Sequence, residues 1–203
     1  VSHLIKAKPS TRWVNIEGPL RPHLYDVPAM EKKWGCLQRM FFNQDVAIYN
    51  VWDKCTTQPL DSAFRNADGD LAYFCHTGKG KILTEYGLLN FRRGSYIVVP
   101  KNITHSFSFE EETNFLVIES KTSSNREPDR GMVGKNAFYD TEALGKPDLN
   151  ALVNFRKEKN SNIKKVFVTR EGQSTLFSYS EDIYDTVGWK GDLWPFTLHV
   201  DDM

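Results

Sequence analysis

Residues 64–105 read FRNADGDLAYFCHTGKGKILTEYGLLNFRRGSYIVVPKNITH, and this stretch decides the fold class. Its centre alternates apolar and polar residues and is interrupted by glycines such as Gly78 and Gly87, a pattern typical of short antiparallel strands joined by tight turns. Gly94 then opens a short apolar strand that ends at Pro100, because proline cannot donate to a central ladder. This density of strands and turns predicts a small antiparallel barrel or jelly roll.

The same stretch resembles the double motif of the cupin barrel, G-x5-H-x-H-x3–4-E-x6-G followed by G-x5-P-x-G-x2-H-x3-N. The second half matches at Gly94, Pro100 and His105, with Asn102 in the place of a motif glycine. Asparagine tolerates a left-handed backbone better than most residues, so this replacement is compatible with the turn. The closing asparagine of the motif is absent, because Phe109 stands there. We therefore expect an all-β, cupin-like antiparallel jelly-roll barrel.

The first half of the motif matches in its pattern of strands and turns, but the residue types that bind metal are absent from it. Leu71 takes the glutamate place, and the two histidine places fall within residues 64–67, which include Asn66. A cupin metal site needs about three imidazole or carboxylate ligands that converge on one point. His105 alone does not hold a metal. We expect a metal-free barrel with a vestigial pocket near His105, Asn66 and Leu71, and we assign no catalytic, cofactor-binding or metal-ligating residue.

Composition narrows the class of partner and compartment. The 203 residues include 26 Lys and Arg and 26 Asp and Glu, so the formal net charge is zero. That balance argues against a nucleic-acid binder and gives no reason to expect an anionic membrane surface. Cys36, Cys55 and Cys75 are widely spaced and form no C-x-x-C pair, which argues against disulfides and structural zinc and favours a reducing cytoplasm. No apolar run reaches membrane-spanning length, and we expect no signal peptide.

The chain divides into three predicted regions. Residues 1–35 are rich in proline and lack periodicity, so they are expected to form an irregular wrapping arm. Residues 36–120 form the barrel, including predicted hairpins in CLQRMFFNQDVAIYNVW and HSFSFEEETNFLVIES. Residues 121–203 form a loop-rich lobe, with strands at KKVFVTR and TLFSYS on either side of a turn at 171–172 and no helix of any strength. This lobe is expected to lead towards a missing catalytic domain.

Other polar residues are assigned structural roles. The segment RNADGD contains Asp68 and Asp70, but a calcium loop would need more ligands at two-residue spacing and a later glutamate. We interpret it as a turn whose Asp and Asn side chains cap their own backbone. His76 lies at the far end of its strand from the cupin ligand places, so we expect it to be exposed or hydrogen-bonded. The segment GKGK precedes a strand rather than a helix, and is therefore no phosphate loop.

Several segments, taken in order, resemble one enzyme family, homogentisate 1,2-dioxygenase. RNADGD with the strand after it and TEYG is similar to the family's central hairpin. EPDRGMVGKNAFYD is similar to its "pdlGPiGanGlanprdF" segment, although Met132–Val133 replace the proline and isoleucine. YDTVGWKGDLWPFTLHVDDM is similar to "fdvvgWhGnlyPykynledF", with Trp189, Gly191 and Pro195 in step. The order and spacing of these segments extend over nearly the whole chain.

The resemblance implies a specific chemistry for the full-length protein. Subunits of that family are two-domain cupin-like proteins that assemble as hexamers, as a dimer of trimers. They use one non-haem Fe(II), held by two histidines and a glutamate, to open homogentisate with dioxygen to maleylacetoacetate in tyrosine and phenylalanine breakdown. The open positions of such a triad accommodate both substrates. The resemblance thus implies a small aromatic acid as substrate and a homo-oligomer, trimer or hexamer, as assembly.

The family's iron ligands and catalytic histidine lie downstream of the segment that aligns with residues 189–203. None of them carries over onto this chain, and His105 is not one of them. The chain therefore resembles the metal-free barrel and the connecting lobe. The alternative is a cupin-like binding or assembly module without catalysis of its own. A third reading, another cupin enzyme such as a sugar isomerase, conflicts with the missing ligands.

Overall fold

A computed structural model describes residues 5–8, 12–19, 24–33, 35–55, 62–125 and 141–203. The chain forms two compact units, residues 1–32 and residues 33–203. In the first unit the described residues contain a short 3-10 helix, η1 (Val27–Ala29), which follows Asp26. The wrapping of the barrel by residues 1–35 stays a prediction.

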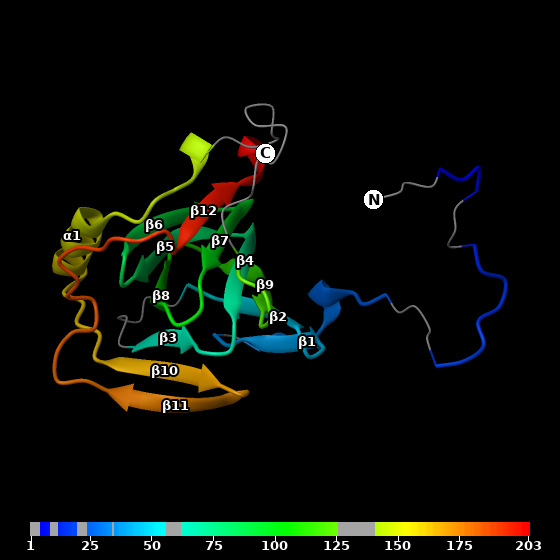
Figure 1. Cartoon of the computed structure of the whole chain (residues 1–203), viewed down its shortest axis with the longest axis horizontal. Coiled ribbons are helices and arrows are strands. Elements are labelled where there is room, and N and C mark those ends of the chain that lie inside the picture. The colour runs from blue at the N-terminus through cyan, green and yellow to red at the C-terminus, as the bar shows by residue number, and fades with distance from the viewer. Residues whose placement is uncertain (1–4, 9–11, 20–23, 34, 56–61, 126–140) are drawn as a thin grey trace. The chain divides into compact units, whose positions relative to one another are not determined.

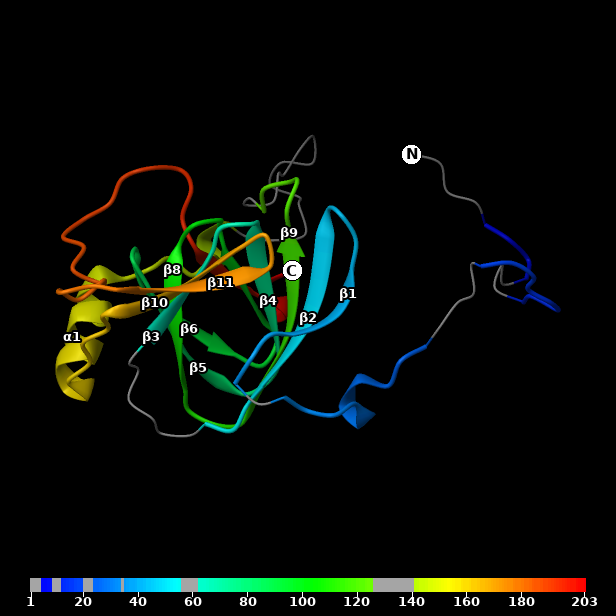
Figure 2. The same ribbon diagram turned by 90° about the horizontal axis from the view of Figure 1, so that it is seen from below.

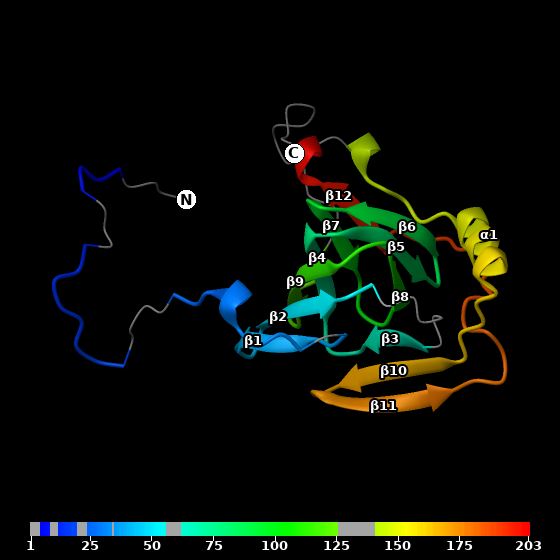
Figure 3. The same cartoon turned by 180° about the vertical axis from the view of Figure 1, so that it is seen from behind.

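The second unit is built mainly from two six-stranded sheets (Figure 1; Figure 3). The first sheet has the order β1-β2-β9-β4-β7-β12 and the second the order β11-β10-β3-β8-β5-β6. The first comprises β1 (Gln38–Phe42), β2 (Val46–Asp53), β9 (Thr113–Ser120), β4 (Asp70–Thr77), β7 (Ser95–Val99) and β12 (Phe196–His199). The second comprises β11 (Gln173–Ser178), β10 (Lys165–Arg170), β3 (Ser62–Asn66), β8 (Thr104–Phe109), β5 (Lys79–Thr84) and β6 (Gly87–Arg92). The predicted cupin-like β-barrel is confirmed.

Of the two hairpins predicted by segment, one is present and one is wrong. β1 pairs with β2 antiparallel, and the strands predicted on either side of the turn at 171–172, β10 and β11, also pair antiparallel, as do β5 and β6. HSFSFEEETNFLVIES contains β8 and β9, but β8 lies in the second sheet and β9 in the first. The acidic turn at 110–112 therefore crosses from one sheet to the other. An alternating pattern identifies one buried face of a strand and does not identify its hydrogen-bonded neighbour, so the sequence could not separate the two arrangements.

The turn chemistry of the cupin-like second half is confirmed. Asn102 has φ of 67°, in the left-handed region that its place in the motif requires. Its backbone N–H donates to the carbonyl of Asn66 at 2.9 Å, which ties the turn before β8 to the end of β3. Gly94 has φ of 88°, and β7 ends before Pro100 as predicted.

Residues of the predicted loop-rich lobe enter both sheets. β10 pairs with β3 in parallel, and β12 pairs with β7 antiparallel. Seen from below, the β10–β11 pair lies beside β3, the strand with which β10 pairs (Figure 2). The boundary proposed at residue 120 stays a prediction. The segment EPDRGMVGKNAFYD, at 127–140, lies outside the described residues.

A helix in this lobe corrects the prediction that the chain has none. Helix α1 (Leu149–Lys159) is capped by Asp148, whose side chain accepts from the Ala151 N–H at 3.0 Å. It buries Leu152 and Phe155, which pack with Leu83 and other residues against the outer face of the second sheet. Only one narrow stripe of the helix is apolar, so its periodicity is weak. The capping aspartate and the basic last turn were the available signals.

Two further 3-10 helices, η3 (Thr141–Ala143) and η4 (Val200–Asp202), flank the last elements. Among the described residues, no helix is both long and apolar enough to cross a membrane. The main core lies between the two sheets, and its largest fully buried members include Phe115, Leu71 and Ile82.

Candidate functional site

The candidate site is the interior of the barrel, where every second residue of each strand points inward. From one end of the barrel to the other, the inward residues change from polar to aromatic. They include Tyr49, Val51 and Asp53 on β2, Phe64 and Asn66 on β3, Leu71, Tyr73 and Cys75 on β4, His105, Phe107 and Phe109 on β8, and Phe115, Val117 and Glu119 on β9.

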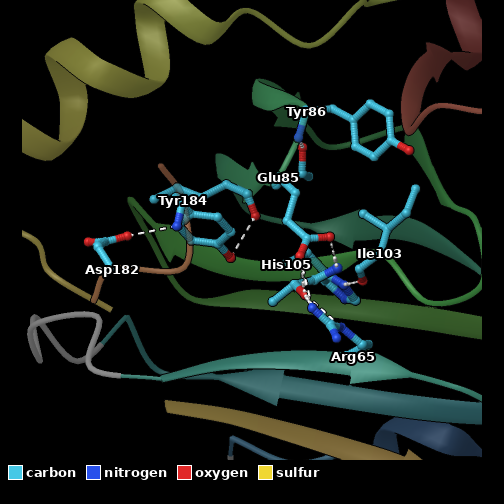
Figure 4. Close-up of polar contacts among 10 residues, drawn as sticks. Arg65, Glu85, Tyr86, Ile103, His105, Asp182 and Tyr184 are labelled. Carbon is cyan, nitrogen blue, oxygen red and sulfur yellow. Dashed lines mark hydrogen bonds and ion pairs between the residues drawn. The ribbon is translucent and has the colours of Figure 1, made fainter. Parts of the chain in front are cut away.

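His105 occupies the middle of this interior and is 1% exposed. Its Nδ1 lies 3.1 Å from the carbonyl oxygen of Ile103, which can only accept a hydrogen bond, so Nδ1 carries the proton (Figure 4). Nε2 is then the acceptor for the Tyr73 hydroxyl, at 2.7 Å. Burial lowers the pKa of His105 to about 4, so the ring is neutral near pH 7. Both ring nitrogens are thus used in hydrogen bonds within the protein.

The larger hollow of the interior is a cavity of about 430 Å³. Its aromatic lining residues are Phe64, Tyr73, Phe107, Phe109, Phe115 and Phe167. Cys36 is exposed and Phe167 is 42% exposed, so the cavity reaches the surface beside them. Asp53 also lines the cavity, and burial raises the pKa of this carboxyl. His105 lines the same cavity.

A smaller hollow of about 260 Å³ lies at the polar end of the interior. Glu119 is buried there, with its Oε1 accepting from Asn66 Nδ2 at 2.7 Å and its Oε2 accepting from the Tyr49 hydroxyl at 2.8 Å. Burial, and then the Glu119 carboxylate, raise the pKa of Tyr49. Leu71 lines this hollow as well.

The structure therefore distributes the three predicted pocket residues along one interior. His105 lines the larger cavity, whereas Asn66 and Leu71 line the smaller hollow. Phe64 and Leu37 line both, which makes the two hollows neighbours. Binding of a ligand by this vestigial pocket stays a prediction.

The outer face of the second sheet carries a separate polar network (Figure 4). Arg65 Nη2 lies 2.8 Å from Glu85 Oε1, and Arg65 Nε donates to Thr104 Oγ1 at 2.7 Å. Glu85 Oε2 also accepts from the Thr104 N–H at 3.1 Å. Further along the same face, the Tyr184 hydroxyl donates to the carbonyl of Leu83 at 3.2 Å. These groups bond one another and hold the outer layer against the sheet.

The other polar residues noted in the sequence have structural positions. His76 is exposed, as predicted. Asn66 Oδ1 accepts from the Asp68 N–H at 3.2 Å, which confirms the predicted local cap for the asparagine. The two aspartates instead bond distant backbone, which corrects the prediction for them. Asp68 accepts from Glu171 N–H at 2.6 Å, and Asp70 accepts from Lys101 N–H at 2.7 Å.

The three cysteines are free thiols in the structure. Cys75 is fully buried, and burial raises the pKa of its thiol to about 12, so it is no thiolate nucleophile near neutral pH. In the part of the chain that is described, no group of three or more His, Cys, Asp or Glu is placed to hold a metal ion.

Sequence reasoning missed Asp53 and Tyr73 as lining residues. Both lie on the inward face of their strands, in step with the apolar residues two positions away. The inward parity of Asp53 with Val51 was a usable signal, because a carboxylate at a core-facing position is unusual. Its place at the aromatic end of the interior depends on the packing of distant strands.

The family model and the curated relatives point to one family. The sequence matches the family described as "Homogentisate 1,2-dioxygenase N-terminal" over residues 11–200. A Saccharolobus solfataricus protein named "Putative dioxygenase" is 30% identical over 168 residues, 81% of this chain and 41% of that protein. Homogentisate 1,2-dioxygenase of Bradyrhizobium diazoefficiens is 22% identical over 192 residues, 86% of this chain and 42% of that protein. A cupin-2 domain containing protein from Shewanella frigidimarina, a solved structure, is 18% identical with a TM-score of 0.35 and covers 44% of this chain and 84% of that chain. The chain thus spans about two fifths of the length of the curated relatives named here.

Proposed function

The chain belongs to the homogentisate 1,2-dioxygenase N-terminal family, and from this premise we propose that it is the N-terminal barrel portion of a ring-cleaving, non-haem iron(II) dioxygenase. The proposed reaction opens the ring of homogentisate with dioxygen to give maleylacetoacetate, a step of tyrosine and phenylalanine breakdown. The observation that carries the proposal is the family match over residues 11–200. Relatives named homogentisate 1,2-dioxygenase, at low identity, support it.

The residues of this barrel do not fit the iron that the family implies. A facial iron(II) site takes two imidazoles and a carboxylate on one side of the metal. His105 has both ring nitrogens in hydrogen bonds, to Ile103 and to Tyr73, and no second imidazole lines its cavity among the described residues. We therefore assign iron binding and catalysis to residues outside this chain, and no catalytic step to its own side chains.

The role proposed for this chain is a metal-free scaffold within a homo-oligomer, a trimer or hexamer, in the cytoplasm. β1 and β11 lie at the ends of the two sheets and carry exposed apolar side chains. Phe42 is 65% exposed, and Leu176 and Phe177 are 48% and 47% exposed. Apolar groups on edge strands favour contacts with a partner. The substrate, a small aromatic acid, is proposed to bind on the catalytic residues outside this chain.

The test compares the natural gene product, purified without oxygen, with residues 1–203 produced alone. We expect the gene product to contain about one iron per subunit, to take up dioxygen with homogentisate and to have a mass well above 23.4 kDa. Residues 1–203 alone should show neither iron nor oxygen uptake. Stoichiometric iron on residues 1–203 would overturn the assignment of the barrel. A gene product of 23.4 kDa that lacks iron and oxygen uptake would overturn the dioxygenase itself.

A second candidate, a non-catalytic binding module, is favoured by the cavity of about 430 Å³ around His105. Cavities of this volume are in the range that holds small molecules. The two candidates differ in iron content and oxygen uptake, and a ligand in the barrel is compatible with either.

A further inference from the structure

The charge on the walls of the larger cavity does not suit an anion such as the aromatic acid that is the proposed substrate. Its lining includes one carboxylate, Asp53, and no lysine or arginine among the described residues. The imidazole that lines it, His105, is a neutral ring whose Nδ1 proton is donated to Ile103. Among the described residues of these walls, no side chain carries a positive charge that could compensate a bound anion, so an aromatic carboxylate would meet only like charge there.

Two hydrogen-bonding groups of the cavity, the Asp53 carboxylate and the Tyr73 hydroxyl, are acceptors. One Oδ1 bond, from the Cys55 N–H at 2.9 Å, leaves Asp53 with unused acceptor positions. Tyr73 donates its hydroxyl proton to His105 Nε2 at 2.7 Å, so the phenol oxygen can only accept from a further partner. Both groups call for a donor on the ligand.

The walls of the cavity consist largely of aromatic rings that pack against one another. The ring of Phe115 lies 5.6 Å from Tyr73, 5.1 Å from Phe107 and 6.1 Å from Phe109, measured between centroids. Edge-to-face and tilted contacts at these distances favour a fixed arrangement of rings. The cavity, about 430 Å³, exceeds the roughly 150 Å³ hollow that accommodates benzene in an engineered protein core. Aromatic walls also attract a cation that comes close to a ring face.

We infer that the barrel interior between Asp53 and Tyr73 binds a small aromatic amine, with the ammonium group at the Asp53 carboxylate and the ring among the phenylalanines. This site goes beyond the proposed dioxygenase function, because it lies in the barrel to which we assign no iron and selects against aromatic acids. The opposite charge preference separates its ligand from homogentisate.

The test uses three probes of one shape and different charge: benzylamine, benzyl alcohol and benzoate. Each is titrated into isotope-labelled protein near pH 7, and the amide shifts of β2, β4 and β8 are followed by NMR. We expect benzylamine to bind at least about tenfold more tightly than benzyl alcohol, since one partly buried ion pair contributes on that order, and benzoate to give no saturable shifts. Benzoate binding as well as benzylamine, or no probe binding at all, would overturn the inference.

Two variants and one matched control locate the site. Asp53→Asn should lower benzylamine affinity about tenfold and leave benzyl alcohol unchanged, because only the charge is removed. Asp45→Asn makes the same chemical change at an exposed turn at the other end of β2 and should leave both affinities unchanged. Val51→Phe fills the cavity and should weaken benzylamine and benzyl alcohol together. Equal benzylamine affinity in wild type and Asp53→Asn, with folding verified by circular dichroism, would contradict the site. None of these readouts involves iron or oxygen uptake.

Discussion

Strands β3 and β8 carry opposite chemistry on their two faces. Phe64 pairs with His105 across the ladder and Arg65 pairs with Thr104, so the two pairs are one residue apart. On the inner face, the rings of Phe64 and His105 meet edge to face at 5.6 Å. On the outer face, Arg65 donates to Thr104 and forms an ion pair with Glu85. Neighbouring residues of one strand thus belong to a neutral aromatic contact on the inner face and to a charged network on the outer face.

The difference shows where this protein can tolerate charge. Two cations on the outer side of the second sheet are paired with carboxylates, Arg65 with Glu85 and Arg156 with Asp182. Among the described residues that line the two hollows, His105 is the one imidazole and is held neutral, Asp53 and Glu119 are the carboxylates, and Arg39 lies at the smaller hollow. The larger cavity therefore offers a ligand acceptors and aromatic surface, whereas these outer ion pairs already match their charges. Substitutions on the two faces should therefore destabilise the protein for different physical reasons.

The largest effect is expected on the inner face, for Phe115→Ala. Phe115 is 1% exposed and its ring contacts those of Tyr73, Phe91 and Phe107. Losing a buried phenylalanine lowers the free energy of unfolding by about 3–5 kcal/mol, from lost transfer and the space left behind. Urea unfolding of the variant measures it. Leu176→Ala, at a side chain 48% exposed, is the control and should change stability by less than about 0.5 kcal/mol. Similar losses at the two sites would mean that the aromatic interior is not the main core.

The next effect is expected on the outer face, for Asp182→Ala. Asp182 Oδ2 lies 2.5 Å from Arg156 Nη2 and accepts from the backbone N–H of Ile163. The carboxylate also accepts from the backbone N–H of Tyr184 (Figure 4). Its removal leaves a mostly buried guanidinium and two N–H groups without this partner, at a cost of about 3 kcal/mol.

A matched control for this outer pair is Glu110→Ala. Glu110 lies 2.7 Å from Lys81, but its side chain is 45% exposed, so the loss should stay under about 1 kcal/mol. The midpoints of urea unfolding measure the loss of stability in both variants. If the two losses in the free energy of unfolding are equal, burial does not determine how much an outer ion pair stabilises the protein. The contrast between the inner and outer faces would then be wrong as stated.

Sequence alone predicted much of this fold because alternation along a strand is local information. The barrel stretch, the turn at Asn102 and the end of β7 at Pro100 all follow from residue types at fixed offsets. The partner of a strand does not, which is why β8 and β9 were expected to pair and instead lie in different sheets. Helix α1 escaped prediction because only Leu152 and Phe155 of its residues are buried, too few for a clear period of 3.6.

The candidate site was predictable in part for the same reason. His105 could be located from the motif, since its spacing to Gly94 and Pro100 is local. The hydrogen bond to Tyr73 and the shared cavity with Asp53 join β8 to β4 and β2, which are distant in sequence. Such convergence depends on how the two sheets face each other, and no spacing rule in one strand contains it. The alternation along one strand identifies which residues point inward, but it does not identify the residues that they contact.

The smallest expected effect is a pH dependence that belongs to the inner face alone. The pKa of His105 falls from its ordinary 6.5 to about 4 in the folded protein, so between these values the unfolded chain binds more protons than the folded one. Stability from this residue is therefore present above about pH 6.5 and is lost as the pH falls towards 4, with a slope approaching about 1.4 kcal/mol per pH unit. His105→Gln should remove that part of the slope in urea unfolding between pH 7 and 5, and His76→Gln, at an exposed position, should keep it. If the His105→Gln and wild-type curves stay parallel over this range, burial does not lower the pKa of His105, and the imidazole takes up a proton inside the barrel as the pH falls to 5. The neutral interior, and with it the contrast between the two faces of β8, would then be wrong.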